Sequence, residues 1–438
     1  MKKLILLELN EINFDIVQSY IKSGLKLPSF ERILSNGLSE TSSEPIYENI
    51  EPWIQWPSVH LGLSYDEHKI FRLGDIVKHD KRKQIFEKIE ENGFSVGAVS
   101  PMNASNKLKN PSYFIPDPWT KTKSDSNFLN SILSDAISQS VNDNSESRIT
   151  LKTVISLSIG FLFLVSPLRM PRLIWFAISS IKKSWRKAIF LDLLLHEIHK
   201  TLLKRNKPNF STIFLNSGAH IQHHYFFNSS AINLSNKIQK NPNWYVRETD
   251  DPLKDLLLEY DRIIHDLTKI DYDLILATGL SQVPYDKVKF YYRLVNHKFF
   301  LDILDISYKE IYPRMTRDFL ITFNNNDEKN RAMQKLSELT LNNISMFNEI
   351  ENRDKELFVT LTYPHEITPN DYIEIDNKYI YLKDHVVFVA IKNGMHSEKG
   401  YVHFSKEIED AKFQKGSHVK EIHNYILKYF GIPESYLE

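Results

Sequence analysis

The sequence contains no cysteine. Disulfide bonds, thiolate nucleophiles, iron–sulfur clusters and cysteine-based zinc sites are therefore excluded, and the absence fits a reducing compartment. Any metal ion must be held by histidine, carboxylate or amide side chains. The sequence also lacks a net charge, because 55 basic and 55 acidic residues cancel. Without a global positive field, nucleic acid is not an expected partner.

Long uninterrupted apolar runs are missing as well. The run Leu4–Leu7 stops at Glu8 and no small-residue cleavage site follows, so the N-terminus indicates a buried strand rather than a signal peptide. The stretch Val154–Ser179 is broken by two prolines and two arginines, whereas a spanning helix needs ~20 mostly apolar residues. We therefore expect no transmembrane segment and a cytoplasmic location.

Strand-like runs rich in Val, Ile, Leu and Phe alternate with helical patterns along the chain. This alternation is typical of an α/β fold whose sheet is covered on both faces. Most of these runs lead into polar residues, and in open α/β sheets ligands bind at the carboxyl ends of the strands. The predicted strands are Lys3–Leu9, Ser95–Ser100, Ser211–Asn216, Leu274–Thr278, Leu357–Tyr363 and Val386–Ile391.

Residues 121–207 interrupt this alternation. A polar stretch up to Arg148 is followed by apolar and basic helix-forming segments. We expect residues 1–120 and 208–438 to form the two parts of the α/β core, and residues 121–207 to form a helical insertion that caps it.

A basic cluster in the insertion lies near two tryptophans, Trp175 and Trp185. Such a segment could contact an anionic membrane surface on the cytoplasmic side. The favoured alternative is an ordinary amphipathic cap with a solvated basic face. The cluster comprises Lys182, Lys183, Arg186 and Lys187.

The strongest local signal is the segment Asn216–Tyr225, which begins where a predicted strand ends. His220, His223 and His224 fall at positions i, i+3 and i+4, so they can share one face of a helix. Neutral imidazoles are common ligands for zinc and similar metals. The segment favours a metal site, and the alternative is a polar helix start with histidines bonded to backbone carbonyls.

Two further segments carry weaker signals. Pro57 and Ser58, within Pro52–Gly62, suit the start of a helix whose free N–H groups favour a bound phosphate or sulfate. The two tryptophans of this segment could equally pack in the core. The late segment Asn393–Tyr401 places His396 in a loop, and a lone histidine there is uninformative by itself.

In their order along the chain, these segments together resemble the alkaline phosphatase-like superfamily, including the type I phosphodiesterase/nucleotide pyrophosphatases. The tail Val419–Pro433 is similar to the closing helix and Gly-Ile-Pro turn of that family. The resemblance implies a three-layer α/β/α sandwich with a helical insertion. It also implies two metal ions, usually zinc, shared by Asp and His residues around a Ser or Thr nucleophile.

The first metal site of the family is partly retained. Its late histidine matches His396, and its Asp-x-x-x-His pair matches Asn216 and His220, with Asn in place of Asp. His223 is a further candidate ligand. We therefore expect at most one divalent ion, zinc or manganese.

The second metal site and the nucleophile depart from the family pattern. The first-strand Asp falls at Asn10, and the Asp-His pair falls at Gly279 and Leu280, neither of which can bind a metal. The nucleophile position falls at Gln55, which cannot attack phosphorus. Ser58 is the candidate to take its place.

The sequence predicts a metal-dependent hydrolase or transferase of phosphate or sulfate esters, with Glu11 or His60 transferring protons. We expect a small-molecule or glycan ester as substrate, and the family resemblance is compatible with a lipid-linked sugar used in polysaccharide synthesis. Alternatives are a catalytically inactive module that binds a phosphorylated sugar or glycan, and a scaffold component. The candidate substrate contacts are Asn10, Asn13, Gln222 and His224.

Overall fold

The computed structural model describes residues 2–79, 81–142, 163–232, 240–313, 317–375, 378–406, 408 and 413–433. A search of these residues for a helix long and apolar enough to cross a membrane finds none. The main domain is built on a seven-stranded sheet in the order β2-β17-β6-β1-β5-β3-β4. Its strands are β1 (Leu4–Leu9), β2 (Leu38–Ser42), β3 (Val96–Val99), β4 (Tyr113–Ile115), β5 (Phe210–Leu215), β6 (Asp273–Ala277) and β17 (Lys399–Phe404).

The central strand β1 is buried on both faces, which explains its continuous apolar sequence. Ile5, Leu7 and Leu9 pack into one hydrophobic core, and Leu4 and Leu6 pack into another. The first core is shared with α1 (Phe14–Lys22), α2 (Pro28–Ser35), α9 (Met170–Ser179), α10 (Arg186–Asn206), α11 (Ser217–Tyr225) and α12 (Pro252–Thr268). The second is shared with α3 (Pro52–Leu61), α6 (Ile85–Glu91) and α15 (Glu421–Phe430). The predicted three-layer α/β/α class is therefore confirmed.

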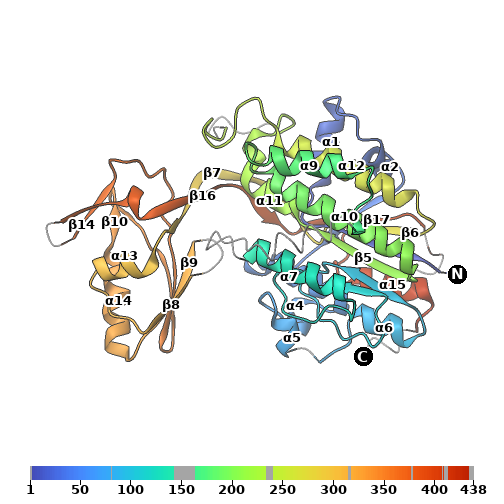
Figure 1. Cartoon of the computed structure of the whole chain (residues 1–438), viewed down its shortest axis with the longest axis horizontal. Coiled ribbons are helices and arrows are strands. Elements are labelled where there is room, and N and C mark those ends of the chain that lie inside the picture. The colour runs from blue at the N-terminus through green and yellow to red at the C-terminus, as the bar shows by residue number, and fades with distance from the viewer. Residues whose placement is uncertain are drawn as a thin grey trace.

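A second lobe stands beside this domain on a two-stranded ribbon (Figure 1). The ribbon pairs β7 (Ser281–Leu294) with β16 (Val386–Ser397) in antiparallel register. The lobe has its own hydrophobic core and a four-stranded antiparallel sheet, β12-β13-β9-β8. Its elements are α13 (His297–Ile303), β8 (Glu310–Pro313), β9 (Asp318–Thr322), α14 (Asn326–Glu338), β10 (Thr340–Leu341), β11 (Ile344–Ser345), β12 (Glu349–Arg353), β13 (Glu356–Thr360), β14 (Tyr372–Ile375), β15 (Lys378–Tyr381) and η4 (Leu382–Asp384).

The lobe corrects two strand predictions. Four predicted strands lie in the central sheet, as β1, β3, β5 and β6. The predicted strand Leu357–Tyr363 is instead β13 of the lobe, because it pairs antiparallel with β9 and β12. The predicted strand Val386–Ile391 is the start of the ribbon strand β16. Residues 208–438 therefore do not form one continuous part of the core.

The segment predicted as an insertion contains α7 (Phe128–Asn142), α9 and α10. The long helix α10 belongs to the core, because His199 Nε2 lies 2.7 Å from Ser211 Oγ of β5 and both residues are fully buried. Residues 143–162, including the start of the apolar run Val154–Ser179, lie outside the described residues. A separate cap therefore stays a prediction.

The remaining short helices are η1 (Tyr47–Asn49), α4 (Tyr65–His68), α5 (Asp75–His79) and η3 (Phe226–Asn228).

A buried carboxyl–imidazole pair joins the sheet to α3. Glu8 of β1 lies 3.2 Å from His60 Nε2, and both side chains are fully buried. Thr212 of β5 donates a hydrogen bond of 2.7 Å to the same carboxyl oxygen of Glu8. The pair faces the second hydrophobic core, on the α3 side of the sheet.

Removing one member of this pair should destabilise the fold. We expect His60→Leu to lower the free energy of unfolding by about 2 kcal/mol or more, because the buried carboxyl of Glu8 loses a hydrogen-bond partner. The double variant Glu8→Leu/His60→Leu should recover most of the loss, since both members of the pair are removed and Thr212 still donates to Leu6 O at 3.1 Å. Urea unfolding measures both, and equal stability of wild type and His60→Leu would contradict the prediction.

Candidate metal centre

Three neighbouring parallel strands bring the site residues together. β1 lies between β5 and β6, and all three end at the same edge of the sheet. The backbone continues this pairing beyond the strands, since the Asn10 amide donates to Leu215 O at 3.1 Å and the Glu11 amide donates to Thr278 O at 3.0 Å. Side chains that follow β1 and β5 therefore lie at a common edge of the sheet, where ligands bind in α/β proteins.

Glu11 adopts a left-handed backbone conformation, with φ at 63°. Such a conformation is costly for a residue other than glycine and persists where the surroundings hold it, often at functional sites. Here the Gln222 side chain donates 2.7 Å to the Glu11 carbonyl, and the Glu11 amide is held by Thr278. The conformation turns the Glu11 carboxylate, which is 1% exposed, toward α11 and β16.

Three potential ligand atoms converge at this point. Glu11 Oε2 lies 3.2 Å from His223 Nε2 and 3.3 Å from His396 Nε2, and the two imidazole nitrogens lie 3.1 Å apart. Ligands about 2.1 Å from a tetrahedral zinc ion are separated by about 3.4 Å, which is close to these distances. Two histidines and one carboxylate are also a known donor set of catalytic zinc sites. The residues therefore fit one divalent ion.

Glu51 contacts one member of the triangle formed by Glu11, His223 and His396. It precedes α3, and its Oε2 lies 3.4 Å from His396 Nδ1, so that Nε2 is left facing Glu11. Carboxylates that contact the outer nitrogen of a metal-bound histidine orient the ring and increase its basicity.

The electrostatics of the three side chains are strongly coupled. Burial disfavours the charge on Glu11, but His396 and His223 outweigh it and hold the pKa of the Glu11 carboxyl well below its usual range. Burial likewise opposes the charge on His396, yet the carboxylates of Glu11 and Glu51 raise its pKa to about 9. Burial raises the pKa of Glu51 to about 7, so this carboxyl titrates near neutral pH.

A network of amide side chains surrounds the Glu11 carboxylate. Asn10 Nδ2 donates to Asn216 Oδ1 at 2.8 Å and to Glu11 Oε1 at 3.1 Å, and Asn10 Oδ1 accepts a 2.8 Å bond from the buried indole of Trp56. Gln282 of β7 donates to Glu11 Oε2. Asn10 and Asn216 therefore satisfy each other rather than facing a metal ion.

Two predicted substrate contacts hold the scaffold in place. The Asn13 side chain caps α1 by accepting from the Asp15 amide at 2.9 Å, and it donates to Gln282 O at 2.8 Å. Gln222 accepts a 3.3 Å bond from the Asn13 amide besides donating to the Glu11 carbonyl. The structure thus uses both amides to position Glu11 and its neighbours, and their contact with substrate stays a prediction.

The predicted ligand set changes in part. His223 and His396 lie in the convergent triangle, but His220 is exposed and contacts the ring of His224, with 5.0 Å between centroids. Asn216 is bonded to Asn10, so Glu11 takes the third position. The histidine ligand on α11 is therefore His223, about one turn after the histidine of the family's Asp-x-x-x-His pair. The carboxylate ligand is Glu11, which follows the Asn10 position by one residue. Glu11 had a sequence signal only as a titratable neighbour.

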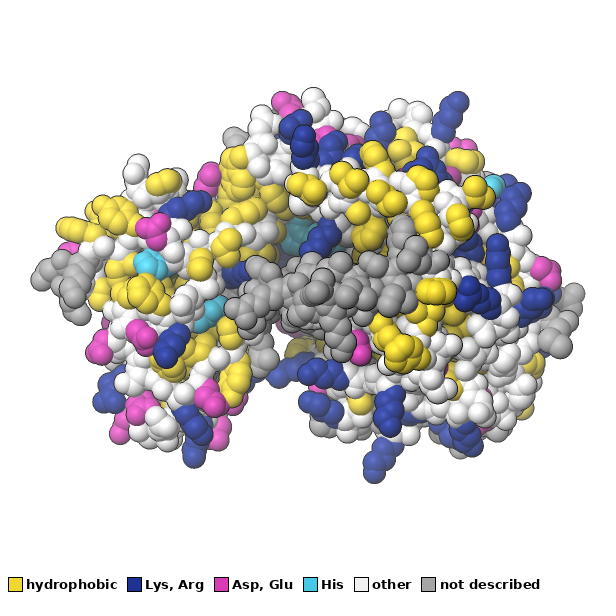
Figure 2. Space-filling model, in the orientation of Figure 1, with side chains coloured by type: hydrophobic (Ala, Val, Ile, Leu, Met, Phe, Trp, Pro, Cys, Tyr) yellow, Lys and Arg dark blue, Asp and Glu magenta, His cyan; other side chains and the backbone are white. Residues whose placement is uncertain are grey.

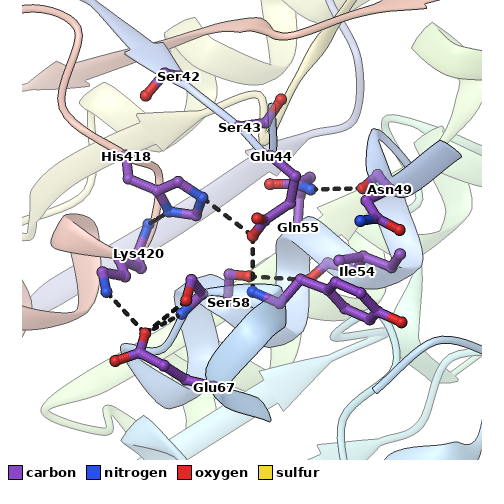
Figure 3. Close-up of polar contacts among 12 residues, drawn as sticks. Ser42, Ser43, Glu44, Asn49, Ile54, Gln55, Ser58, Glu67, His418 and Lys420 are labelled. Carbon is purple, nitrogen blue, oxygen red and sulfur yellow. Dashed lines mark hydrogen bonds and ion pairs between the residues drawn. The ribbon is translucent and has the colours of Figure 1, made fainter. Parts of the chain in front are cut away.

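Gln55, at the family's nucleophile position, and Ser58, the candidate to replace it, both form other contacts (Figure 3). Gln55 donates to Asn49 O at 3.1 Å, and Ser58 donates to Ile54 O at 3.2 Å. His68 Nε2 lies 3.1 Å from Ser58 Oγ, but His68 Nδ1 accepts from the Ile70 amide at 2.9 Å. The proton of a neutral His68 is therefore on Nε2, where it donates to Ser58 and cannot accept the serine proton.

His60 is also misplaced for the predicted proton transfer. It is fully buried and paired with Glu8 within β1, whereas Glu11 lies beyond the end of that strand. Its histidine–carboxyl pairing is structural.

A second group of potential ligands, formed by His196, Glu197 and Asp266, lies between α10 and α12. Lys200 Nζ already contacts Glu197 at 2.6 Å and Asp266 at 3.1 Å, and Arg169 contacts Asp266 at 2.8 Å. These side-chain cations occupy the place that a metal ion would take. The group is an ion-pair network that ties the two helices together.

The sequence matches no family model and no curated protein. Solved structures with a similar fold include phosphonoacetate hydrolase from Sinorhizobium meliloti 1021 in complex with phosphonoformate (11% identity, 98% of this chain, 95% of that chain, TM-score 0.42). Murine ectonucleotide pyrophosphatase/phosphodiesterase 5 is also similar (9% identity, 99% of this chain, 96% of that chain, TM-score 0.41). So is alkaline phosphatase PafA (11% identity, 99% of this chain, 96% of that chain, TM-score 0.44).

These proteins belong to the alkaline phosphatase-like superfamily that the sequence motifs resemble. At such low identities and TM-scores the likeness supports no conclusion about activity, which therefore rests on the residues of the site.

The triangle predicts which histidines retain metal. Protein purified without chelators should carry about one equivalent of zinc or manganese, and His223→Ala, His396→Ala and Glu11→Gln should each lose it because each removes a ligand atom. His220→Ala is the matched control on the same helix and should keep the metal. Plasma mass spectrometry measures the content, and metal lost from His220→Ala but kept by His223→Ala would contradict the assignment.

Proposed function

We propose that this protein is a hydrolase of phosphate or sulfate esters that holds one divalent metal ion on Glu11, His223 and His396. The observation that carries the proposal is the convergence of three ligand atoms within 3.1–3.3 Å of one another at the carboxyl edge of the sheet. A metal ion held there would polarise an ester oxygen and lower the pKa of bound water.

The chain's own groups supply proton transfer and access. Glu51 has a pKa raised to about 7 and lies beside His396, so it can accept and return a proton near neutral pH. His223 is 29% exposed, which leaves the triangle open to solvent on that side. Gln55 cannot act as a nucleophile, and Ser58 is hydrogen-bonded to Ile54 O, so the group that attacks phosphorus or sulfur is water.

The second candidate is a catalytically inactive module that binds a phosphorylated sugar or glycan. Amide side chains at family metal positions, Asn10 and Asn216, suit a neutral polyol as well as a cation. Action on a glycan or lipid-linked sugar, and a cytoplasmic place in polysaccharide synthesis, remain part of the proposal. A scaffold role is the third candidate.

Substituting Glu51 separates an enzyme from a binding module. We expect Glu51→Gln to lower kcat about 100-fold or more at saturating metal, because the amide cannot transfer a proton. Its weaker contact with His396 should lower metal affinity as a separate effect. A panel of aryl phosphate monoesters, diesters and sulfates provides the assay. Glu48→Gln, an exposed neighbour, is the control. Metal-loaded wild type that turns over none of these esters would favour the binding module, and a fully active Glu51→Gln would remove Glu51 from the mechanism.

We also propose that α9 contacts an anionic membrane surface. Residues 147–191 contain eight basic residues and no acidic residue. Side chains on α9 and the turn after it are unusually exposed for apolar groups, with Trp175 at 51%, Ile178 at 65% and Ile181 at 85%. Figure 2 shows hydrophobic side chains with Lys and Arg beside them on this face. Basic segments with exposed apolar side chains bind at anionic interfaces.

Three residues of the predicted basic and aromatic cluster are not free to contact a membrane. Trp185 is buried, and Lys183 and Arg186 pair with Asp250 at 2.5 Å and Asp255 at 2.9 Å. Trp175 and the apolar side chains around it therefore replace Trp185 as the proposed membrane contact.

Vesicle sedimentation tests this contact. Wild type should pellet with vesicles containing phosphatidylserine and remain in the supernatant with phosphatidylcholine alone, since the attraction is partly electrostatic. Trp175→Ser/Ile178→Ser should pellet much less. Phe299→Ser, an exposed aromatic side chain on the other lobe, is the control. Equal pelleting of wild type and the α9 variant would contradict the proposal.

A further inference from the structure

We propose that Lys289 and Lys392 of the β7–β16 ribbon, together with Arg317 beside it, bind a second phosphate or sulfate group of the substrate. The inference extends the proposed function and rests on it, because it assigns the substrate class as an ester that carries a further anionic group. The cluster comprises Lys289 of β7, Lys392 of β16 and Arg317, which directly precedes β9.

The ribbon places two lysines directly opposite each other. Lys392 of β16 pairs with Lys289 of β7 in the antiparallel register. Side chains of directly opposed residues point to the same face, and like charges in such a pair destabilise the ribbon. Arg317 adds a third positive charge, which acts on both lysines. An arrangement that opposes folding in this way is explained when an anion binds between the charges.

Aromatic rings hold the three cationic groups in place. The Arg317 guanidinium lies 4.4 Å from the ring centre of Tyr291, and Lys289 Nζ lies 6.0 Å from the same ring. Lys392 Nζ lies 4.3 Å from the ring centre of Tyr285. Cation–π contacts of this kind fix the direction of the cation without neutralising its charge. The positive heads therefore remain available to an anion.

The acidic groups around the cluster do not neutralise it. Arg317 has Glu349 at 3.8 Å, but that carboxylate is 58% exposed and the distance exceeds that of a good hydrogen bond. Within the part of the chain that the structure describes, no carboxylate forms an ion pair with Lys289 or Lys392. Asp286 and Glu51 act on Lys392, and Glu349 acts on Lys289, in each case without forming an ion pair with the lysine. Burial and the neighbouring cations lower the pKa of both lysines, consistent with uncompensated positive charge.

The cluster is next to the candidate metal centre. Lys392 precedes His396 by four residues on β16, and its charge acts on Glu51, which contacts His396. The same strand therefore carries a metal ligand and a cation of the second site. An ester bound at the metal would extend along β16 and place its further anionic group between the opposed lysines.

Binding of inorganic pyrophosphate, measured by titration calorimetry without turnover, tests the second site separately from catalysis. We expect Lys289→Met/Lys392→Met to weaken binding about 10-fold or more, because two charge-assisted contacts are lost while the aliphatic stems remain. Lys287→Met, an exposed lysine on β7, is the matched control and should bind like wild type.

The outcomes separate this inference from the proposed function. If wild type does not bind pyrophosphate, or if the double variant binds as tightly as wild type, the second site is overturned. Equal weakening by Lys287→Met would mean a diffuse charge effect and would overturn it as well. Loss of ester turnover with intact, lysine-dependent anion binding would instead overturn the proposed hydrolase and leave the anion site standing.

Discussion

The backbone of Glu11 is the constraint on which the candidate site depends. Glu11 lies two residues beyond the end of the central strand β1. The left-handed conformation at φ 63° turns the carboxylate toward His223 and His396. Thr278 and Gln222 hold that conformation through the amide and the carbonyl of the residue. Strain at one residue is thus balanced by hydrogen bonds from two other elements.

The second lobe is tied to this site through β16. One end of that strand carries His396, and the other end enters the lobe. Gly394 lets β16 pass close to α11, because an added Cβ would lie 2.6 Å from Gln222 O. The backbone pairing of β7 with β16 therefore positions the metal ligand His396, the amide of Gln282 and the opposed lysines together. Movement of the lobe relative to the sheet would change all three together.

Part of this arrangement could be predicted from the sequence. Apolar runs that end in polar residues identified four of the seven strands of the central sheet and the edge where the site lies, because burial on both faces leaves a clear pattern. The spacing of His220, His223 and His224 identified a helix with imidazoles on one face. It could not identify which part of that face meets β1, since the packing of α11 on the sheet decides this. The second lobe was missed because its strands resemble core strands in composition. The pairing of Lys289 with Lys392 joins residues far apart in the chain and has no local signal.

The central claim is that Glu11, His223 and His396 share one metal ion. Anomalous diffraction from crystals grown with zinc or manganese tests it most directly. We predict a single strong peak about 2.0–2.3 Å from Glu11 Oε2, His223 Nε2 and His396 Nε2, with no peak beside Asn10. A peak coordinated by His220 and Asn216, two peaks at the positions of a two-metal centre, or an unfilled triangle at saturating metal would contradict the claim.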